Sequence, residues 1–390
     1  MDLDSRYPAL PDLRRRARRR IPHFVWEFLD SGTGTEAALH RNRAALDAVI
    51  MRPAVLTGEA TPELETAFLG EHWAAPFGIA PVGMSGLVWP DAERRLARLA
   101  ARENLPYCLS TVASQPPEAV GPLTGGRGWF QLYPPRDARI LTDMLTRIHD
   151  SGFSTLVLTV DVPVASRRER QRRGGLTQPP RLTPRLLAHV LQRPAWALGM
   201  ARHGMPRMRF IESYSTHKGP LPSTAHAGYL LRTSPDWEYL RALRREWPGR
   251  LVVKGVLEAE DAVRLATEGV DAVWVSNHAG RQFDAAPAAL DALPAIRAAL
   301  GPDFPLIFDS GVQSGLDILR ALALGADFVM LGRAWHFGLA AFGDRGAAHV
   351  AHILRDDLTA CMGQMGLSRP DQARTRLMPA GNEPRAPVQP

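Results

Sequence analysis

The sequence predicts an α/β protein built as a TIM (β/α)8 barrel, with an N-terminal helical extension and a long insertion after the fourth strand. Eight short runs rich in β-branched and aromatic residues occur after residue 76. Helical patterns with apolar residues three and four positions apart follow most of them. A chain of 390 residues, 45% apolar, suits one large domain with extensions or two ordinary domains. Eight strand–helix units that close on themselves make a barrel.

Each strand is expected to place its carboxyl end at the face where such barrels carry their chemistry. The expected strands are 77–81, 106–110, 128–133, 155–161, 251–254, 271–277, 305–309 and 327–332. The expected helices include 92–102, 138–149, 259–267, 288–299 and 316–324.

The barrel is expected to span residues 77–378, after an N-terminal helical extension at 1–76. The stretch 162–233 is too long for an ordinary βα loop, and long insertions of this kind form lids or contact surfaces. The tail 379–390 has the composition of a disordered segment.

Composition excludes several classes of protein. Two cysteines, Cys108 and Cys361, exclude a disulfide scaffold and a Cys-rich metal site, and they favour a reducing, cytoplasmic compartment. The chain has no apolar run of 18 residues and no leader pattern, so we expect neither a membrane span nor standard secretion. The run RRRARRR at 14–20 indicates a solvated helix face rather than a nucleic-acid site, because no base-stacking motif accompanies it.

Polar residues at successive strand ends predict an active site. His278 and Arg281, in SNHAGRQFD at 276–284, can accept a proton near neutral pH and hold a carboxylate. Asp161 ends the fourth strand and can orient that imidazole and raise its basicity, and Arg168 follows it. Each residue alone also fits a structural role, as a loop cap or an interstrand salt bridge.

Lys254 ends the fifth strand and is, with Lys218, one of only two lysines among 47 basic residues. A fixed cation at that position suits stabilisation of a developing anion. The segments DSGVQSG at 309–315 and LGRA at 331–334 follow the last two strands, where barrels bind phosphate through backbone N–H groups. They predict a phosphorylated cofactor or substrate, held near Ser310, Gly311, Gly332 and Arg333.

From about residue 22 to 368 the chain resembles the FMN-dependent α-hydroxy acid dehydrogenase and oxidase family, which includes glycolate oxidase, flavocytochrome-type lactate dehydrogenase and mandelate dehydrogenase. The motifs that carry the resemblance are IAPVGM, LST, FQLY, TVDVP, VVKGV, SNHAGRQFD, DSGV and ALGADFVMLGRA. The resemblance implies FMN as cofactor, no metal, and oxidation of a small (S)-2-hydroxy acid to the 2-oxo acid, with a hydride equivalent passing to flavin N5.

The resemblance also implies roles for individual residues. His278 would be the base and Asp161 its partner, Arg168 and Arg281 would bind the substrate carboxylate, and Tyr133 would hydrogen-bond substrate. The residues implied for FMN binding are Pro81, Val82, Gly83, Ser110, Gln131, Thr159, Lys254, Ser276, Asp309, Ser310, Gly311, Gln313, Gly332 and Arg333.

Three positions depart from the family pattern. Phe28 replaces a tyrosine that contacts the substrate, which removes one hydrogen bond. Gln313 replaces a phosphate-binding arginine, which leaves Arg333 as the main cation and predicts weaker FMN binding. Ala279 replaces a glycine and adds one methyl group. Val112 and Ala165 are small where glycolate oxidase carries larger residues, so we expect a wider pocket that favours longer or aromatic acids.

Gly83 favours a dehydrogenase that passes electrons to a quinone or cytochrome, because the family's oxidases tend to have alanine there. The basic segment 170–206, with Leu186, Leu187, Leu191 and Trp196, predicts an interfacial helix at the inner face of the cell membrane; a mobile lid is the alternative. The resemblance also predicts a homotetramer. An O2-using oxidase, an FMN-dependent isomerase and a flavin-binding pseudoenzyme remain alternative functions.

Overall fold

The computed structural model describes residues 2–59, 61–175, 183–214 and 234–378. Its central sheet has eight parallel strands in the order β3-β10-β9-β8-β7-β6-β5-β4. A parallel bridge between Ile79 and Tyr107 joins the first and last of them, so the sheet closes into a barrel. The predicted TIM barrel is confirmed, and each predicted run overlaps one strand. The strands are β3 (Phe77–Ile79), β4 (Cys108–Ser110), β5 (Gly128–Leu132), β6 (Phe153–Thr159), β7 (Arg250–Val256), β8 (Ala272–Val275), β9 (Leu306–Phe308) and β10 (Phe328–Leu331).

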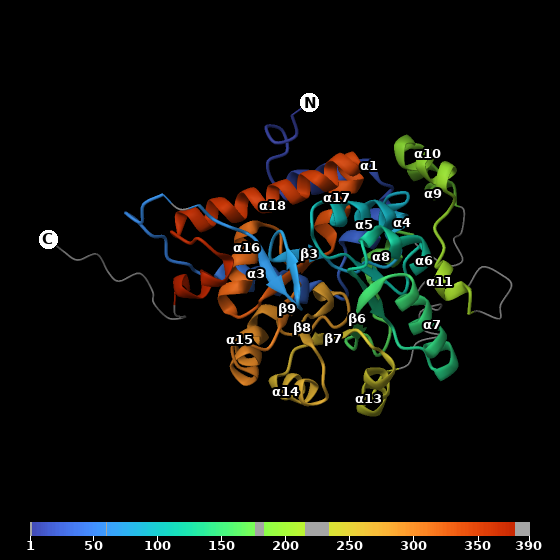
Figure 1. Cartoon of the computed structure of the whole chain (residues 1–390). Coiled ribbons are helices and arrows are strands. Elements are labelled where there is room, and N and C mark those ends of the chain that lie inside the picture. The colour runs from blue at the N-terminus through green and yellow to red at the C-terminus, as the bar shows by residue number, and fades with distance from the viewer. Residues whose placement is uncertain (1, 60, 176–182, 215–233, 379–390) are drawn as a thin grey trace.

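Helices surround the sheet, and the five expected helical segments match α5, α7, α14, α15 and α16 within one residue at each end (Figure 1). The barrel helices and their short neighbours are α4 (Ser85–Val88), α5 (Ala92–Arg102), α6 (Pro117–Val120), α7 (Ala138–Asp150), α13 (Trp237–Glu246), α14 (Ala259–Thr267), α15 (Ala289–Leu300), α16 (Gly315–Leu324), α17 (Arg333–Phe342) and α18 (Asp344–Gln364). Short 3-10 helices η1 (Gly121–Thr124), η2 (His278–Gly280) and η3 (Pro370–Arg376) complete this part.

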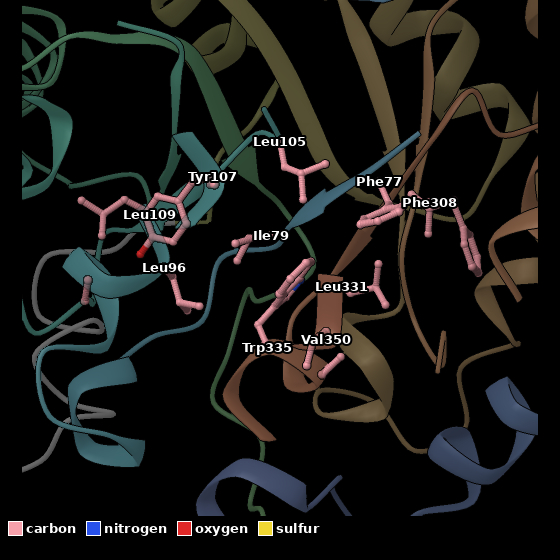
Figure 2. Close-up of a cluster of buried hydrophobic side chains, with 14 of the residues drawn as sticks. Phe77, Ile79, Leu96, Leu105, Tyr107, Leu109, Phe308, Leu331, Trp335 and Val350 are labelled. Carbon is pink, nitrogen blue, oxygen red and sulfur yellow. The ribbon is translucent and has the colours of Figure 1, made fainter. Parts of the chain in front are cut away.

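Alternation along the strands divides the core in two. Phe77, Ile79 and Leu331 face outward and pack against helix residues such as Trp335 (Figure 2). Alternate strand residues belong to a separate cluster inside the barrel, because successive strand side chains point to opposite faces. That inner cluster contains Phe68, Trp73, Ala80, Cys108, Trp129, Val157, Val252, Ala272, Trp274, Ile307, Phe328 and Met330.

The N-terminal extension contains helices α1 (Leu10–Arg20), α2 (His23–Asp30) and α3 (Ala37–Ala48), followed by an antiparallel hairpin of β1 (Thr66–Phe68) and β2 (Glu71–Trp73). The hairpin was not predicted. Phe68 stacks on Phe328, the first residue of β10, at a centroid distance of 5.0 Å. The hairpin therefore fills the barrel interior at the amino ends of the strands.

The arginine run of α1 forms the expected solvated face with Arg14, Arg15, Arg18 and Arg19, which are exposed, but Arg16 and Arg20 are half-buried and pack against α17. Arg16 and Arg20 both donate to the carbonyl oxygen of Ala341, at 3.1 and 2.8 Å. The guanidinium of Arg16 also lies 4.1 Å from the ring centroid of Phe342. These contacts tie α1 to the end of α17.

The insertion after β6 folds into α8 (Glu169–Arg173), α9 (Pro184–Leu191), α10 (Pro194–His203) and α11 (Arg209–Glu212). Leu187 and Leu191 are 54% and 70% exposed, as an interfacial helix requires. The prediction for Trp196 was wrong: its ring is 2% exposed and its Nε1 donates to the Leu87 carbonyl at 3.0 Å. Residues 176–182 and 215–233 of the insertion, with Lys218, and the tail 379–390 lie outside the described residues.

No helix within the described ranges is long and apolar enough to cross a membrane. The boundaries expected at residues 76 and 378 stay predictions.

Candidate active site

A cavity of about 880 Å³ lies at the carboxyl ends of the barrel strands, and residues in or just after each of the eight strands line it. It brings together all but two of the predicted site residues. The two exceptions, Asp161 and Ser276, lie directly behind the lining and contact it. The predicted residues on its wall are Phe28, Pro81, Val82, Gly83, Ser110, Gln131, Tyr133, Thr159, Arg168, Lys254, His278, Arg281, Asp309, Ser310, Gly311, Gln313, Gly332 and Arg333.

His278 and Asp161 form a close pair between two strand ends. The Nδ1 atom of His278 lies 2.9 Å from Oδ1 of Asp161, and 21% of the His278 side chain remains exposed. A carboxylate only accepts hydrogen bonds, so we assign the imidazole proton to Nδ1, which leaves Nε2 as an acceptor. Burial lowers the pKa of His278, and the Asp161 carboxylate, which raises it, does not compensate. The ring is therefore neutral at pH 7, without the predicted net rise in basicity.

Lys254 is the centre of a buried ionic network. Its ammonium donates to Ser276 Oγ at 2.7 Å and lies 3.1 Å from Oδ2 of Asp309 and 3.9 Å from Oδ2 of Asp161. Burial lowers the pKa of Lys254, but the two carboxylates outweigh burial and the pKa is raised. Lys254 therefore stays a cation inside the barrel mouth.

Arg281 and Arg168 both reach the cavity from neighbouring loops. Arg281 donates to the carbonyl oxygens of Phe28 and Leu29 at 2.7 and 3.2 Å, while Arg168 donates to Ser166 Oγ at 3.2 Å. Burial lowers the pKa of Arg281 well below its usual range, and the positive charges of Arg168 and Arg333 lower it further. Three cations that repel one another around one cavity make a site for an anion.

The loops after β9 and β10 form the predicted phosphate region. Gly311 has φ +98°, a conformation that favours glycine, and the Gln313 N–H donates to Asp317 Oδ2 at 2.9 Å. Arg333 begins α17 and donates to the Ala279 carbonyl at 2.8 Å. The backbone of this region is held in place by contacts within the protein.

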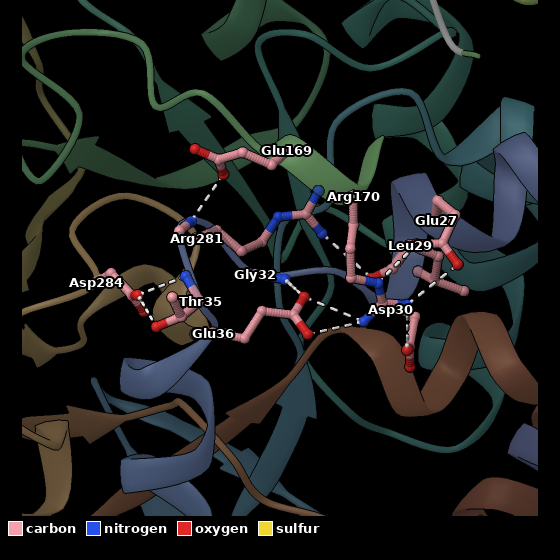
Figure 3. A network of polar contacts seen from close by, with 12 residues as sticks. Glu27, Leu29, Asp30, Gly32, Thr35, Glu36, Glu169, Arg170, Arg281 and Asp284 are labelled. Carbon is pink, nitrogen blue, oxygen red and sulfur yellow. Dashed lines mark hydrogen bonds and ion pairs between the residues drawn. The ribbon is translucent and has the colours of Figure 1, made fainter. Parts of the chain in front are cut away.

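The segment from α2 to α3 lines one side of the cavity. It is held by Arg170, which sequence reasoning missed (Figure 3). Arg170 binds Glu27 through Nε at 2.6 Å, Glu36 through Nη1 at 3.0 Å and Asp30 through Nη2 at 3.1 Å. Arg170 is 134 or more residues away in sequence from each of the three acidic residues, which themselves lie close together. Their only sequence signal is a group of acidic residues in an otherwise basic N-terminal region.

Comparison with known proteins decides the family. A sequence profile of the FMN-dependent dehydrogenases matches residues 17–379. The chain belongs to the FMN-dependent dehydrogenase family. L-lactate dehydrogenase of Pectobacterium atrosepticum is 36% identical to this chain over 362 residues, which cover 92% of this chain and 93% of that protein. L-lactate dehydrogenase of Pseudomonas paraeruginosa is 36% identical over 358 residues, 91% of this chain and 93% of that protein.

Solved structures agree with this assignment. The monotopic membrane protein (S)-mandelate dehydrogenase superimposes on the FMN-dependent dehydrogenase described here with a TM-score of 0.90 and 34% identity, covering 95% of this chain and 98% of that one. Mandelate oxidase superimposes with a TM-score of 0.79 and 32% identity, over 95% of this chain and 98% of that one.

The cavity of this FMN-dependent dehydrogenase fits the cofactor. Gln131 Nε2 and Thr159 Oγ1 are buried without a hydrogen-bond partner, and buried polar atoms of native proteins normally have one. Both belong to residues that line the cavity, where the donors and acceptors of an isoalloxazine edge would satisfy them. At Gly332 a Cβ atom would lie 3.1 Å from Val82 Cγ2, so glycine keeps open the space between the loops that follow β3 and β10. No group of three or more potential metal ligands occurs in the described part of the chain.

Proposed function

We propose that this FMN-dependent dehydrogenase oxidises an (S)-2-hydroxy acid to the 2-oxo acid. The observation that carries the proposal is the convergence of a neutral, Asp-paired His278 and the cations Arg168 and Arg281 on one cavity. A base beside a carboxylate site is what removal of the hydroxyl proton of a 2-hydroxy acid requires. The names of the similar proteins, lactate and mandelate dehydrogenases, support the same substrate class.

Each residue then has a defined task. Arg168 and Arg281 hold the substrate carboxylate, with Tyr133 as a further hydrogen-bond partner. His278 accepts the hydroxyl proton at Nε2, and Asp161 stabilises the imidazolium that results through the Nδ1 hydrogen bond. FMN, when bound, supplies the two-electron acceptor.

The residues that would hold FMN divide into two groups. Pro81, Val82 and Gly83, together with Ser110, Gln131, Thr159 and Lys254, would surround the ring system. The backbone N–H groups of Ser310 and Gly311, with Gln313, Gly332 and Arg333, would face the phosphate, while Asp309 and Ser276 hold Lys254 in place. Arg333 is the main cation available to the phosphate in this assignment.

The variant His278→Gln tests the proposal. It should retain FMN with an unchanged absorbance spectrum but lose reduction of the flavin by hydroxy acid at least a thousandfold in stopped-flow measurements. Tenfold or smaller loss would contradict the role of His278 as base. Loss of FMN would instead assign it to cofactor binding.

We propose a quinone or cytochrome as electron acceptor. A Cβ atom at Gly83 would lie 2.6 Å from Val112 Cγ2, so the alanine found in oxidases does not fit here without movement of Val112. The similarity to mandelate oxidase keeps an O2-using oxidase as the second candidate. Turnover of a panel of hydroxy acids with a quinone analogue, in air and anaerobically, separates them, because an oxidase produces hydrogen peroxide at a rate matching turnover.

The insertion is proposed as a peripheral contact with the inner face of the cell membrane. Leu187, Leu191 and Leu198 are each more than half exposed on α9 and α10, and the solved mandelate dehydrogenase is described as monotopic. Changing all three to Gln should abolish sedimentation with vesicles that contain anionic lipid. Val263→Gln, on the partly exposed face of α14, is the control. Equal sedimentation of both variants would contradict the membrane contact and favour the alternative that the insertion is a mobile lid. The homotetramer stays a prediction.

A further inference from the structure

Three non-glycine residues beside the proposed base have positive φ angles. His278 has φ +56° and Ala279 +54° in the turn after β8, and Ser310 has φ +93° in the turn after β9. Side chains with a Cβ atom rarely adopt this region, and such conformations persist only where surrounding contacts enforce them. The turn that presents His278 is therefore held by specific neighbours.

The hydroxyl of Ser310 is one of these neighbours. It donates to Oδ1 of Asp309 at 2.7 Å and accepts from the N–H of Ala279 at 3.1 Å. The N–H of Asn277 lies 3.4 Å from the same oxygen. Ser310 is 5% exposed, so no bulk water replaces these bonds.

A second hydroxyl acts in parallel. Ser276 Oγ donates to the same Asp309 oxygen at 2.6 Å and accepts from the N–H of His278 at 3.0 Å. Two serine hydroxyls thus connect one carboxylate to consecutive N–H groups of the strained turn. The Asp309 carboxylate is itself fixed by Lys254 at 3.1 Å.

We propose that Ser310 is a positioning residue for His278: its hydroxyl holds the turn at 277–279 so that the imidazole stays against Asp161. The inference rests on the proposed role of His278 as base. Without the hydroxyl, the part-buried N–H of Ala279 loses its partner and the turn relaxes toward an ordinary backbone conformation. The imidazole then leaves its bond of 2.9 Å to Asp161.

The test uses the FMN-loaded enzyme and the pair Ser310→Ala and Ser310→Gly. Both remove the hydroxyl and keep the backbone N–H, but only glycine also removes the strain at φ +93°. Both variants should lower kcat tenfold or more, with KM and FMN affinity changed less than twofold. Ser151→Ala is the control, because it removes a buried hydroxyl that does not line the cavity and that donates to the backbone carbonyl oxygen of Arg147.

The pH profile separates positioning from a general structural role. The charged groups around His278 are Asp161, which raises its pKa, and Lys254 and Arg168, which lower it. Loss of the Asp161 contact therefore moves the acid limb of the kcat/KM profile to lower pH in both Ser310 variants.

Three results would overturn the inference: unchanged kcat, an unshifted acid limb, or a fall in FMN affinity as large as the fall in kcat. Full activity in Ser310→Gly with loss in Ser310→Ala would also overturn it, since strain rather than the hydroxyl would then be decisive. If His278→Gln retains flavin reduction, the proposed function fails. If His278→Gln loses flavin reduction but the Ser310 variants keep the parent kcat and pH profile, only the inference about Ser310 fails and the proposed function stands.

Discussion

Removal of Arg170 should loosen the segment from α2 to α3, which lines one side of the active-site cavity. The Arg170→Ala change leaves three clustered carboxylates, Glu27, Asp30 and Glu36, of which Asp30 keeps an ion pair with Arg14. The local charge of these five groups, Arg14 and Arg170 with the three carboxylates, changes from −1 to −2. Breaking a fully buried ion pair costs about 3–5 kcal/mol. Because the Arg170 side chain is 28% exposed, we expect a lower cost of about 2–3 kcal/mol in the free energy of unfolding.

The assay is urea unfolding of the FMN-loaded Arg170→Ala variant, followed by flavin and tryptophan fluorescence. Arg173→Ala, an exposed change on the same helix α8, is the control and should lie within about 0.5 kcal/mol of the parent. Arg168, the proposed carboxylate-binding residue, immediately precedes α8, so loosening α8 should displace it. The KM for hydroxy acid should therefore rise several-fold in Arg170→Ala but not in Arg173→Ala. Equal unfolding free energies and equal KM values in the two variants would refute the reasoning.

Two further predictions concern the substrate pocket and the loop supports. Phe28, Val112 and Ala165 all line the cavity, so kcat/KM should rise from glycolate through lactate to mandelate. Burying the phenyl group of mandelate is worth roughly 2 kcal/mol, whereas the hydrogen bond lost with Phe28 in place of tyrosine is worth about 1 kcal/mol. Phe28→Tyr should help the small acids most, and steady-state kinetics with glycolate as the best substrate would contradict the pocket argument. Burial raises the pKa of Glu93, whose Oε1 accepts from the N–H groups of Gly86 and Ser114, so the native state binds this proton more tightly than the unfolded chain. The free energy of unfolding should fall as the pH rises from about 4.3, the ordinary glutamate pKa, through the raised pKa of Glu93. Urea unfolding at a series of pH values should show this fall in the parent protein and not in Glu93→Gln. The same pH dependence in both proteins would contradict the prediction.

The sequence predicts what depends on local pattern. The buried strands are short apolar runs after turn residues, and their carboxyl ends carry His278, Asp161 and Lys254, so topology alone places these three together. The hairpin of β1 and β2 escaped prediction because strands of three residues show too little alternation.

Contacts between distant segments could not be predicted in the same way. An amphipathic pattern shows that a helix has an apolar face but not what covers that face. For this reason Trp196 was assigned to the membrane, although it packs against α2 and α4. Arg170 is far in sequence from its three acidic partners, and no motif links them. The positive φ of Ser310 depends on hydrogen bonds from the neighbouring loop, which the residue type does not reveal.

The hairpin residues Phe68 and Trp73 close the barrel at the end opposite the cavity. With FMN in the proposed position, substrate, product and electron acceptor would all approach it from the same face. An acceptor as large as a quinone or a cytochrome cannot reach the flavin edge through the barrel axis while a hydroxy acid occupies the other side. Turnover should accordingly divide into two half-reactions that share one entrance, and a series of double-reciprocal plots at different acceptor concentrations should be parallel.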